Sequence, residues 1–107
     1  MRILLDECIP RPLRHELPGH DVRTVPEMGW SGKRNGDLLQ LMTAENFDVF
    51  LTVDQNLRYQ QNLKAVRVGI VMFVASSNRL VDLVPLMPKV HGALAAIQPG
   101  DYVEVAA

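Results

Sequence analysis

Residues 1–10 read MRILLDECIP, and this stretch decides the fold expected for the whole chain. An apolar run as short as residues 3–5 is typical of a buried strand, and Pro10 just beyond it suits the first turn of a helix. Two carboxylates, Asp6 and Glu7, therefore stand where a buried strand ends. Because ligands of open α/β sheets bind at the carboxyl ends of the strands, we expect a site at this edge.

The same context occurs a second time along the chain. Residues 49–53 (VFLTV) form another apolar run, and that run ends at Asp54. Two buried strands that each end in an acid predict a shared anionic site.

Strand and helix patterns alternate along the rest of the chain. Strands are predicted at residues 2–6, 21–25, 48–53, 69–74 and 101–105. Helical patterns lie between them, at residues 10–17, 37–45, 55–63 and 78–97. The strands at 21–25 and 101–105 alternate apolar and polar residues, so we expect them at the sheet edges. This order predicts an α/β fold: a three-layer α/β/α sandwich around a mainly parallel sheet of about five strands.

Capping residues and prolines define the helices and loops. Asp37, with Gln40 three residues later, fits an acidic N-cap in a capping box, and Asn78 fits the N-cap of the last helix. Pro85 and Pro88 are expected to divide that last helix.

The residues from 26 to 36 include three glycines and are predicted to form a loop, in which Trp30 either packs on the core or stacks on a base. Packing is the preferred interpretation.

Composition limits the class of protein. A chain of 107 residues fits one domain with one core. A net charge of −1 gives no reason to expect nucleic-acid binding by the protein's overall charge. The Lys and Arg residues all precede Val90, however, so a local basic surface remains an alternative. The single cysteine, Cys8, excludes an intramolecular disulfide and is expected to be an inert core thiol. We expect no signal peptide, no membrane partner and a cytoplasmic location, since no apolar run approaches the ~20 residues of a membrane span.

Three aspartates are the main candidates for a site. Asp37 reaches the edge of Asp6 and Asp54 if its helix follows the strand at 21–25, because right-handed crossovers bring parallel strand ends to one edge. Carboxylates brought together would be stabilised by Mg²⁺ or Mn²⁺, which can polarise a phosphate and activate water. Structural alternatives stay open: Asp37 as an N-cap, Asp54 as a turn residue, and Glu7 turned away by the pleat. The histidines show no ligand spacing: His15, His20 and His91.

Several of these residues resemble a known family. The segments are Leu4-Leu5-Asp6-Glu7, Gly19-His20-Asp21-Val22, Gly29-Trp30-Ser31-Gly32 with Asp37, and Leu51-Thr52-Val53-Asp54. Over about residues 2–75 their order and spacing resemble the short PIN-like proteins of bacteria, relatives of PIN-domain ribonuclease toxins. The resemblance implies a single PIN-like domain over residues 1–107.

The resemblance also implies an activity and its residues. The expected function is a Mg²⁺- or Mn²⁺-dependent endoribonuclease, a phosphodiester hydrolase that cleaves single-stranded RNA as the toxin of a toxin–antitoxin system. By position, Asp6, Asp37 and Asp54 would be the catalytic, metal-binding acids, and Glu7 would be a supporting acid. An antitoxin protein is the expected partner, and a homodimer is left open. The cations expected to contact RNA phosphates are Arg11, Lys33, Arg34 and Arg58.

The chain departs from the family pattern at three positions. The family usually has a second acid two residues after the position of Asp54, followed by Phe, where this chain has Asn56 and Leu57. It also usually has Asn at the position of Cys8. Asn56 still offers a carbonyl oxygen as a supporting group, with less charge. This difference favours an alternative function, a catalytically degenerate PIN-like module that binds RNA or protein.

A third interpretation is a flavodoxin-like receiver, which also carries acids at strand ends. It would need a lysine after the strand at 69–74, and Ala75-Ser76-Ser77 stands there instead.

Overall fold

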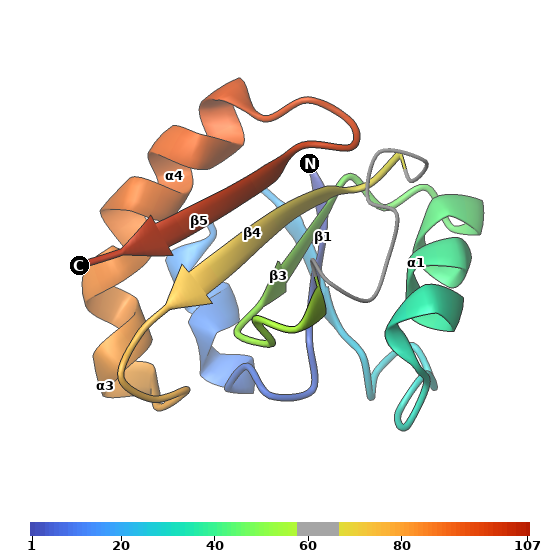
Figure 1. The fold of residues 1–107 in the computed structure, drawn as a ribbon, viewed down its shortest axis with the longest axis horizontal. Helices are drawn as coiled ribbons and strands as arrows, with labels where there is room; N and C mark the ends of the chain where they lie inside the picture. Colours follow the sequence, from blue (N-terminus) through green and yellow to red (C-terminus); the bar gives the residue numbers. More distant parts are fainter. Residues whose placement is uncertain (58–66) are drawn as a thin grey trace.

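The chain folds into a five-stranded, all-parallel sheet with the strand order β2-β1-β3-β4-β5 (Figure 1). The structure is a computed structural model that describes residues 1–57 and 67–107. The strands are β1 (Arg2–Leu5), β2 (Asp21–Thr24), β3 (Val49–Thr52), β4 (Gly69–Val74) and β5 (Tyr102–Ala106). The helices are η1 (Arg11–Glu16), α1 (Asn35–Ala44), α3 (Leu80–Leu83), η3 (Val84–Leu86) and α4 (Met87–Ala96), where η marks a 3₁₀ helix.

The predicted sheet is confirmed, including which strands are central. β1, β3 and β4 lie in the middle and are almost entirely buried, while the two alternating strands, β2 and β5, form the edges. A strand covered on both faces is apolar at every position, whereas an edge strand keeps polar residues where it meets solvent. The continuous and alternating patterns therefore predicted correctly which strands are central and which are edges.

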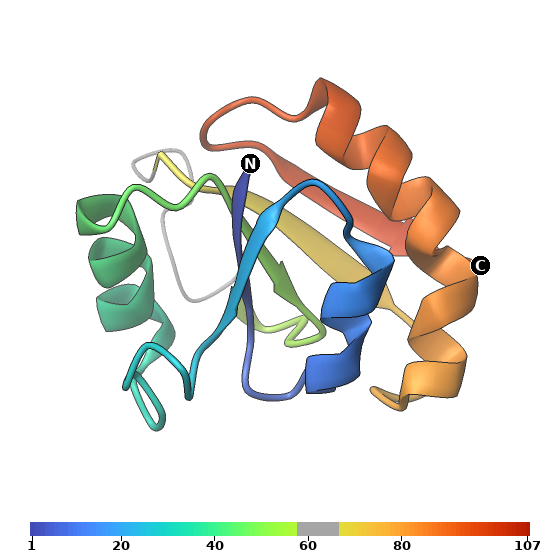
Figure 2. The ribbon, with the colours of Figure 1, turned by 180° about the vertical axis from the view of Figure 1, so that it is seen from behind.

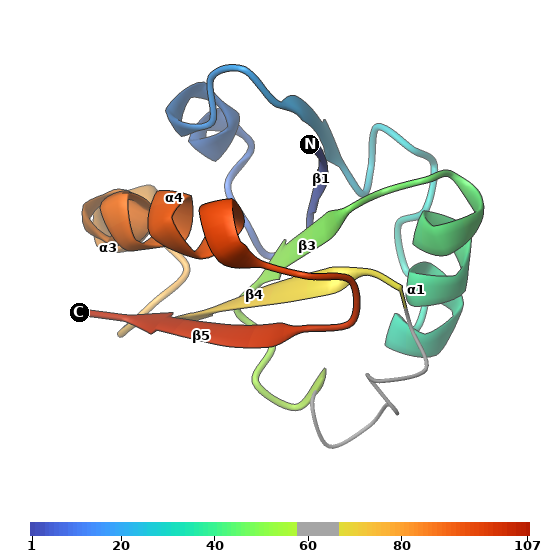
Figure 3. The same ribbon diagram turned by 90° about the horizontal axis from the view of Figure 1, so that it is seen from above.

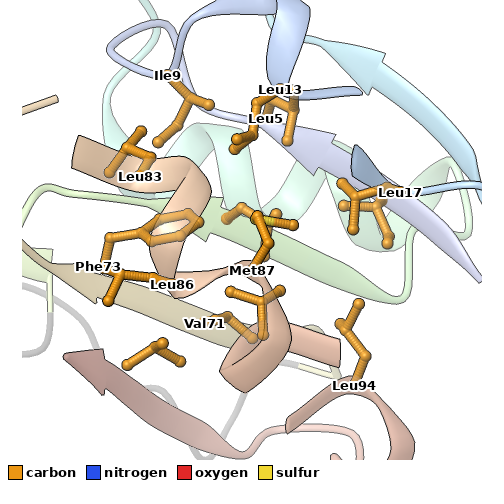
Figure 4. Packing of buried hydrophobic residues seen from close by; sticks show 14 of the residues in the cluster. Leu5, Ile9, Leu13, Leu17, Val71, Phe73, Leu83, Leu86, Met87 and Leu94 are labelled. Atoms are coloured by element: carbon orange, nitrogen blue, oxygen red, sulfur yellow. The ribbon is translucent and has the colours of Figure 1, made fainter. Parts of the chain in front are cut away.

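Helices cover both faces of the sheet and complete a three-layer sandwich (Figure 3). Successive residues of a strand point to opposite faces, so Ile3 and Leu5 join one core cluster and Leu4 joins the other. The first cluster is covered by η1, α3, η3 and α4, and Figure 4 shows Leu5 and Phe73 within it. The second cluster is covered by α1. The sandwich leaves the carboxyl ends of the strands at one edge.

Both predicted N-caps are wrong. α1 begins at Asn35 with Arg34 in the N-cap position, and no side chain caps it. Asp37 lies instead in the first turn, where its negative charge interacts favourably with the positive end of the helix dipole. Asn78 does not cap α3 either, because its side chain donates a 2.7 Å hydrogen bond to the backbone oxygen of Cys8. Each of these helices begins two residues away from the residue predicted to cap it.

Of the other helix predictions, one differs in detail and one is confirmed. The segment predicted at residues 10–17 is a 3₁₀ helix, with a proline in its first turn. The long segment at 78–97 is divided at the prolines as expected, into α3, η3 and α4. The predicted helix at 55–63 lies mostly outside the described residues.

The glycine-rich connection between β2 and α1 is a loop, as predicted. Gly29 and Gly32 have positive φ angles of 74° and 79°, which other residues rarely adopt. Trp30, between them, is buried with its ring centroid 5.8 Å from that of Phe47 at an interplanar angle of 67°. The preferred packing role of Trp30 is therefore confirmed.

Acids at the amino ends of the strands serve the fold. Asp21 accepts hydrogen bonds from Arg2 at 2.8 Å and Arg23 at 3.0 Å, and Asp48 accepts one from the backbone N–H of Arg2 at 2.7 Å. These contacts tie β1, β2 and β3 together at the edge opposite the candidate site. In residues 1–57 and 67–107 no helix is both long and apolar enough to cross a membrane.

Candidate active site

Strand register places the first two acids on neighbouring strands. β1 and β3 are hydrogen-bonded partners, and Leu5 pairs with Leu51 at the end of the ladder. The N–H of Asp6 continues this pairing by donating to the carbonyl of Leu51 at 3.0 Å. Asp6 and Thr52, the next residue on each strand, therefore leave the sheet side by side at its carboxyl edge.

Thr52 links the two candidate acids. Its hydroxyl donates to Oδ2 of Asp6 at 2.7 Å and accepts a hydrogen bond from the N–H of Asp54 at 3.0 Å. The residue is fully buried, with 0% of its surface exposed. A buried hydroxyl with both a donor and an acceptor partner is held in one orientation, so it fixes the carboxylate of Asp6 relative to the backbone of Asp54.

Asp6 is half-buried and has two further hydrogen bonds from its own loop. The N–H of Glu7 donates to Oδ1 at 2.8 Å, and the thiol of Cys8 lies 3.5 Å from Oδ2. Burial raises the pKa of the Cys8 thiol, and the negative charge of Asp6 raises it further. The thiol therefore stays protonated at neutral pH and acts as a weak donor rather than a nucleophile.

Asp54 sits in a tight turn that also reaches α1. Its Oδ1 accepts a hydrogen bond from the N–H of Asn56 at 3.1 Å, and its Oδ2 accepts one from the side-chain amide of Asn35 at 3.2 Å. The first contact is the turn role that the sequence left open for this residue. The second brings the amino-terminal end of α1 to the end of β3.

Glu7 lies in the turn after β1, which ends at Leu5, so the strand pleat does not set its direction. Its Oε1 accepts a 2.6 Å hydrogen bond from the N–H of Gly32 in the β2–α1 loop. Its side chain therefore holds that loop to the β1–η1 connection.

Asp37 lies near this edge, but the structure does not group it with the other two acids. It is exposed in the first turn of α1, two residues after Asn35. Among residues 1–57 and 67–107, no three His, Cys, Asp or Glu side chains are arranged to hold a metal ion. The described site is thus a pair of acids joined through Thr52, with Asp37 on the adjacent helix.

Sequence reasoning missed Thr52 and Asn35. The signal for Thr52 was a single hydroxyl in an otherwise apolar buried run, two residues before the acid. Asn35 lies in a glycine-rich segment where Asn is common, so its sequence context carried no signal.

The donors that are present fit a hard divalent cation. Mg²⁺ is commonly bound through one or two carboxylates while it retains several waters. Asp6 and Asp54 offer oxygen atoms from adjacent strand ends, and each carboxylate oxygen has capacity beyond the contacts described above. Thr52 holds the carboxylate of Asp6, and Asn35 and Asn56 hold that of Asp54. This donor set suits a single Mg²⁺ or Mn²⁺ ion.

Three of the four predicted RNA-contacting cations lie in the described residues. Arg11, Lys33 and Arg34 are all exposed, in η1 and in the loop before α1. Arg58 lies outside the described residues.

A cavity of about 350 Å³ adjoins the candidate site. It lies between the β1–η1 connection and the end of β2. Its lining residues are Asp6, Glu7, Ile9, Pro10, Arg11, Thr24, Pro26 and Glu27.

The site lies in the part of the chain that matches a known family. A family model described as a PIN like domain matches residues 1–77, which include Asp6, Thr52 and Asp54. A search of curated proteins finds no significant match, and neither does a search of solved structures. PIN-like domains form a nuclease-type family whose members generally use divalent metals. With almost three quarters of its length matched, the chain belongs to the PIN-like domain family.

Proposed function

We propose that this protein is a metal-dependent endoribonuclease that cleaves single-stranded RNA. The observation that carries the proposal is the buried Thr52 hydroxyl, which joins Asp6 to Asp54 at the carboxyl edge of the sheet. Buried polar groups in proteins are usually hydrogen-bonded, and the partners of the Thr52 hydroxyl are the carboxylate of Asp6 and the backbone N–H of Asp54.

The residues divide the work as follows. Asp6 and Asp54 would hold Mg²⁺ or Mn²⁺, which when bound polarises a phosphate and lowers the pKa of a water. Thr52 holds the carboxylate of Asp6 in one orientation. Asp37, exposed on the adjacent helix, would accept a proton from the attacking water.

Three exposed cations would hold the RNA strand. Arg11, Lys33 and Arg34 would contact phosphates, an interaction that weakens as salt rises. Arg58 has the same proposed role from outside the described residues.

The test is cleavage of a fluorescein-labelled single-stranded RNA in Mn²⁺. Asp6→Asn keeps the shape of the side chain but removes its charge, and we expect a loss of at least about a hundredfold in rate. Asp48→Asn makes the same change at the opposite edge of the sheet and should leave the rate unchanged. If Asp6→Asn cleaves as fast as the parent, the assigned site is wrong.

A second candidate function is a degenerate PIN-like module that binds RNA or a protein without cutting. Asn56 in place of an acid favours it, as does the finding that in the described residues Asp37 does not join Asp6 and Asp54 in a group of three metal-binding side chains. The parent protein separates the two candidates: RNA binding without any Mn²⁺-dependent cleavage would support the binding module.

A role as a cytoplasmic toxin with a cognate antitoxin is part of the first proposal. Induced expression of the parent protein in a bacterial host should arrest growth, and expression of Asp6→Asn at the same level should not. Co-expression of a small neighbouring open reading frame should restore growth if it encodes the antitoxin.

A further inference from the structure

The cavity beside Asp6 has a composition that the metal site does not explain. Asp6 forms one wall together with the β1–η1 connection, and the end of β2 forms the other. Figure 2 shows both connections at the same end of the sheet. Ile9, Pro10 and Pro26 give it apolar surface, while Glu7 and Glu27 add carboxylates to that of Asp6. At about 350 Å³ it lies at the small end of the range for ligand sites, which suits a single planar ring system.

Glu27 is held as an ionised acceptor. Its Oε1 pairs with Arg14 and also accepts a 3.0 Å hydrogen bond from the N–H of Thr24. The N–H of Glu27 donates in return to the hydroxyl of Thr24 at 3.3 Å. The Arg14 guanidinium holds the pKa of Glu27 below its usual value, with the Thr24 contacts adding to the effect.

The second oxygen of Glu27 is available to a ligand. All the contacts made to this carboxylate fall on Oε1, and within the described part of the chain no group donates a hydrogen bond to Oε2. Glu27 is exposed to solvent, and Arg14 and Thr24 orient its carboxylate. An oriented carboxylate beside apolar surface suits a ligand that has both a flat apolar face and an N–H donor at its edge.

We infer that this cavity binds one nucleobase of a single-stranded RNA and prefers a base with an exocyclic amino group over uracil. The inference rests on the proposed function, because it places this base beside the phosphate that lies at Asp6. The apolar wall of Ile9, Pro10 and Pro26 packs on the face of the base, and Glu27 accepts from its amino group. Uracil presents two carbonyl oxygens around a single N–H, so its edge is repelled by the carboxylate. Arg11, on the same wall, reaches the adjoining phosphate.

The test compares two RNAs that differ mainly in the amino group. Fluorescein-labelled hexamers of cytidine and of uridine are titrated with the parent protein in EDTA at low salt, and binding is followed by fluorescence anisotropy. The cytidine hexamer should bind about tenfold more tightly. Glu27→Gln should bring the ratio close to one, while Glu45→Gln, the same change on an exposed residue far from the cavity, should leave it at about ten.

A second variant keeps the test decisive if Glu27→Gln does not fold. Pro26 is exposed, so Pro26→Ala should fold, and loss of apolar wall should weaken both hexamers by a similar factor while the preference for cytidine remains. Equal affinities of the parent protein for the two hexamers would overturn the inference. So would a folded Glu27→Gln that retains the parent's preference, or a Pro26→Ala that binds both hexamers as tightly as the parent.

The assay is independent of catalysis because it contains no metal ion. If Asp6→Asn fails to abolish cleavage but Glu27→Gln removes the base preference, the proposed enzyme site fails and the base site stands. If Asp6→Asn abolishes cleavage but Glu27→Gln keeps the base preference, only the base site is rejected.

Discussion

The hydroxyl of Thr52 is the structural centre of the site, and Thr52→Val removes it with little change in shape. The variant loses the hydrogen bond to the Asp6 carboxylate at 2.7 Å and leaves the N–H of Asp54 without its acceptor. A hydrogen bond to a charged group contributes about 1.5–3 kcal/mol, and the lost backbone contact adds about 1 kcal/mol. Because Asp6 is only half-buried, water can replace part of the first contact, so we expect a loss of about 2–3 kcal/mol.

Urea denaturation followed by circular dichroism measures this loss, and a thermal scan should show Tm lower by about 10 °C. Thr52→Ser keeps the hydroxyl and loses only one methyl group, at a cost of about 1 kcal/mol. Thr43→Val makes the same chemical change on an exposed helix residue and should alter stability by less than about 0.5 kcal/mol. A Thr52→Val variant as stable as the parent, or a Thr52→Ser variant that loses as much as Thr52→Val, would refute the reasoning.

Two further predictions concern packing and pH. Gly69→Ala should destabilise the fold by about 1–2 kcal/mol, because the new Cβ would lie 2.8 Å from Cδ1 of Ile97. Gly92 lies in α4, and a Cβ there would meet no atom of another segment within 4 Å, so Gly92→Ala should stabilise the fold by about 0.5–1 kcal/mol. Urea denaturation of both variants checks the contrast. The ion pair between Glu27 and Arg14 lowers the pKa of Glu27, so its contribution to stability is complete above the ordinary pKa of 4.5 and is lost as pH falls through the lowered value. The difference in stability between the parent and Glu27→Gln should therefore shrink from pH 7 into strong acid, and a difference that stays constant over that range contradicts the assignment.

The sheet could be predicted because the burial of each strand determines its pattern of apolar residues. β1, β3 and β4 are covered on both faces, so they are apolar at almost every position, and the edge strands β2 and β5 alternate. The helix starts were harder to predict. Asp37 and Asn78 have the right side chains for N-caps, but Asn78 donates instead to the Cys8 carbonyl in another part of the chain. Such long-range competition for a donor has no signal in local sequence.

The candidate site could be predicted only in part. Asp6 and Asp54 each follow a buried run, so their position at one edge followed from parallel strand topology. The contacts that join them depend on the register of β1 against β3, which no local pattern gives. Thr52 is an ordinary strand former and Asn35 an ordinary loop residue until that register is known. The resemblance to PIN-like proteins pointed to the right family. The structure does not group Asp37 with the other two acids in the described residues, and a catalytic role for Asp37 stays a prediction.

The central claim is that Asp6 and Asp54 hold one divalent ion, and calorimetric titration with Mn²⁺ tests it most directly. The titration uses the parent protein at neutral pH and compares it with Asp6→Asn, Asp54→Asn and the control Asp48→Asn. We predict binding of one Mn²⁺ per chain to the parent and to the control, and loss of that binding in both site variants. No binding to the parent at millimolar Mn²⁺, or unchanged binding in both site variants, would contradict the account.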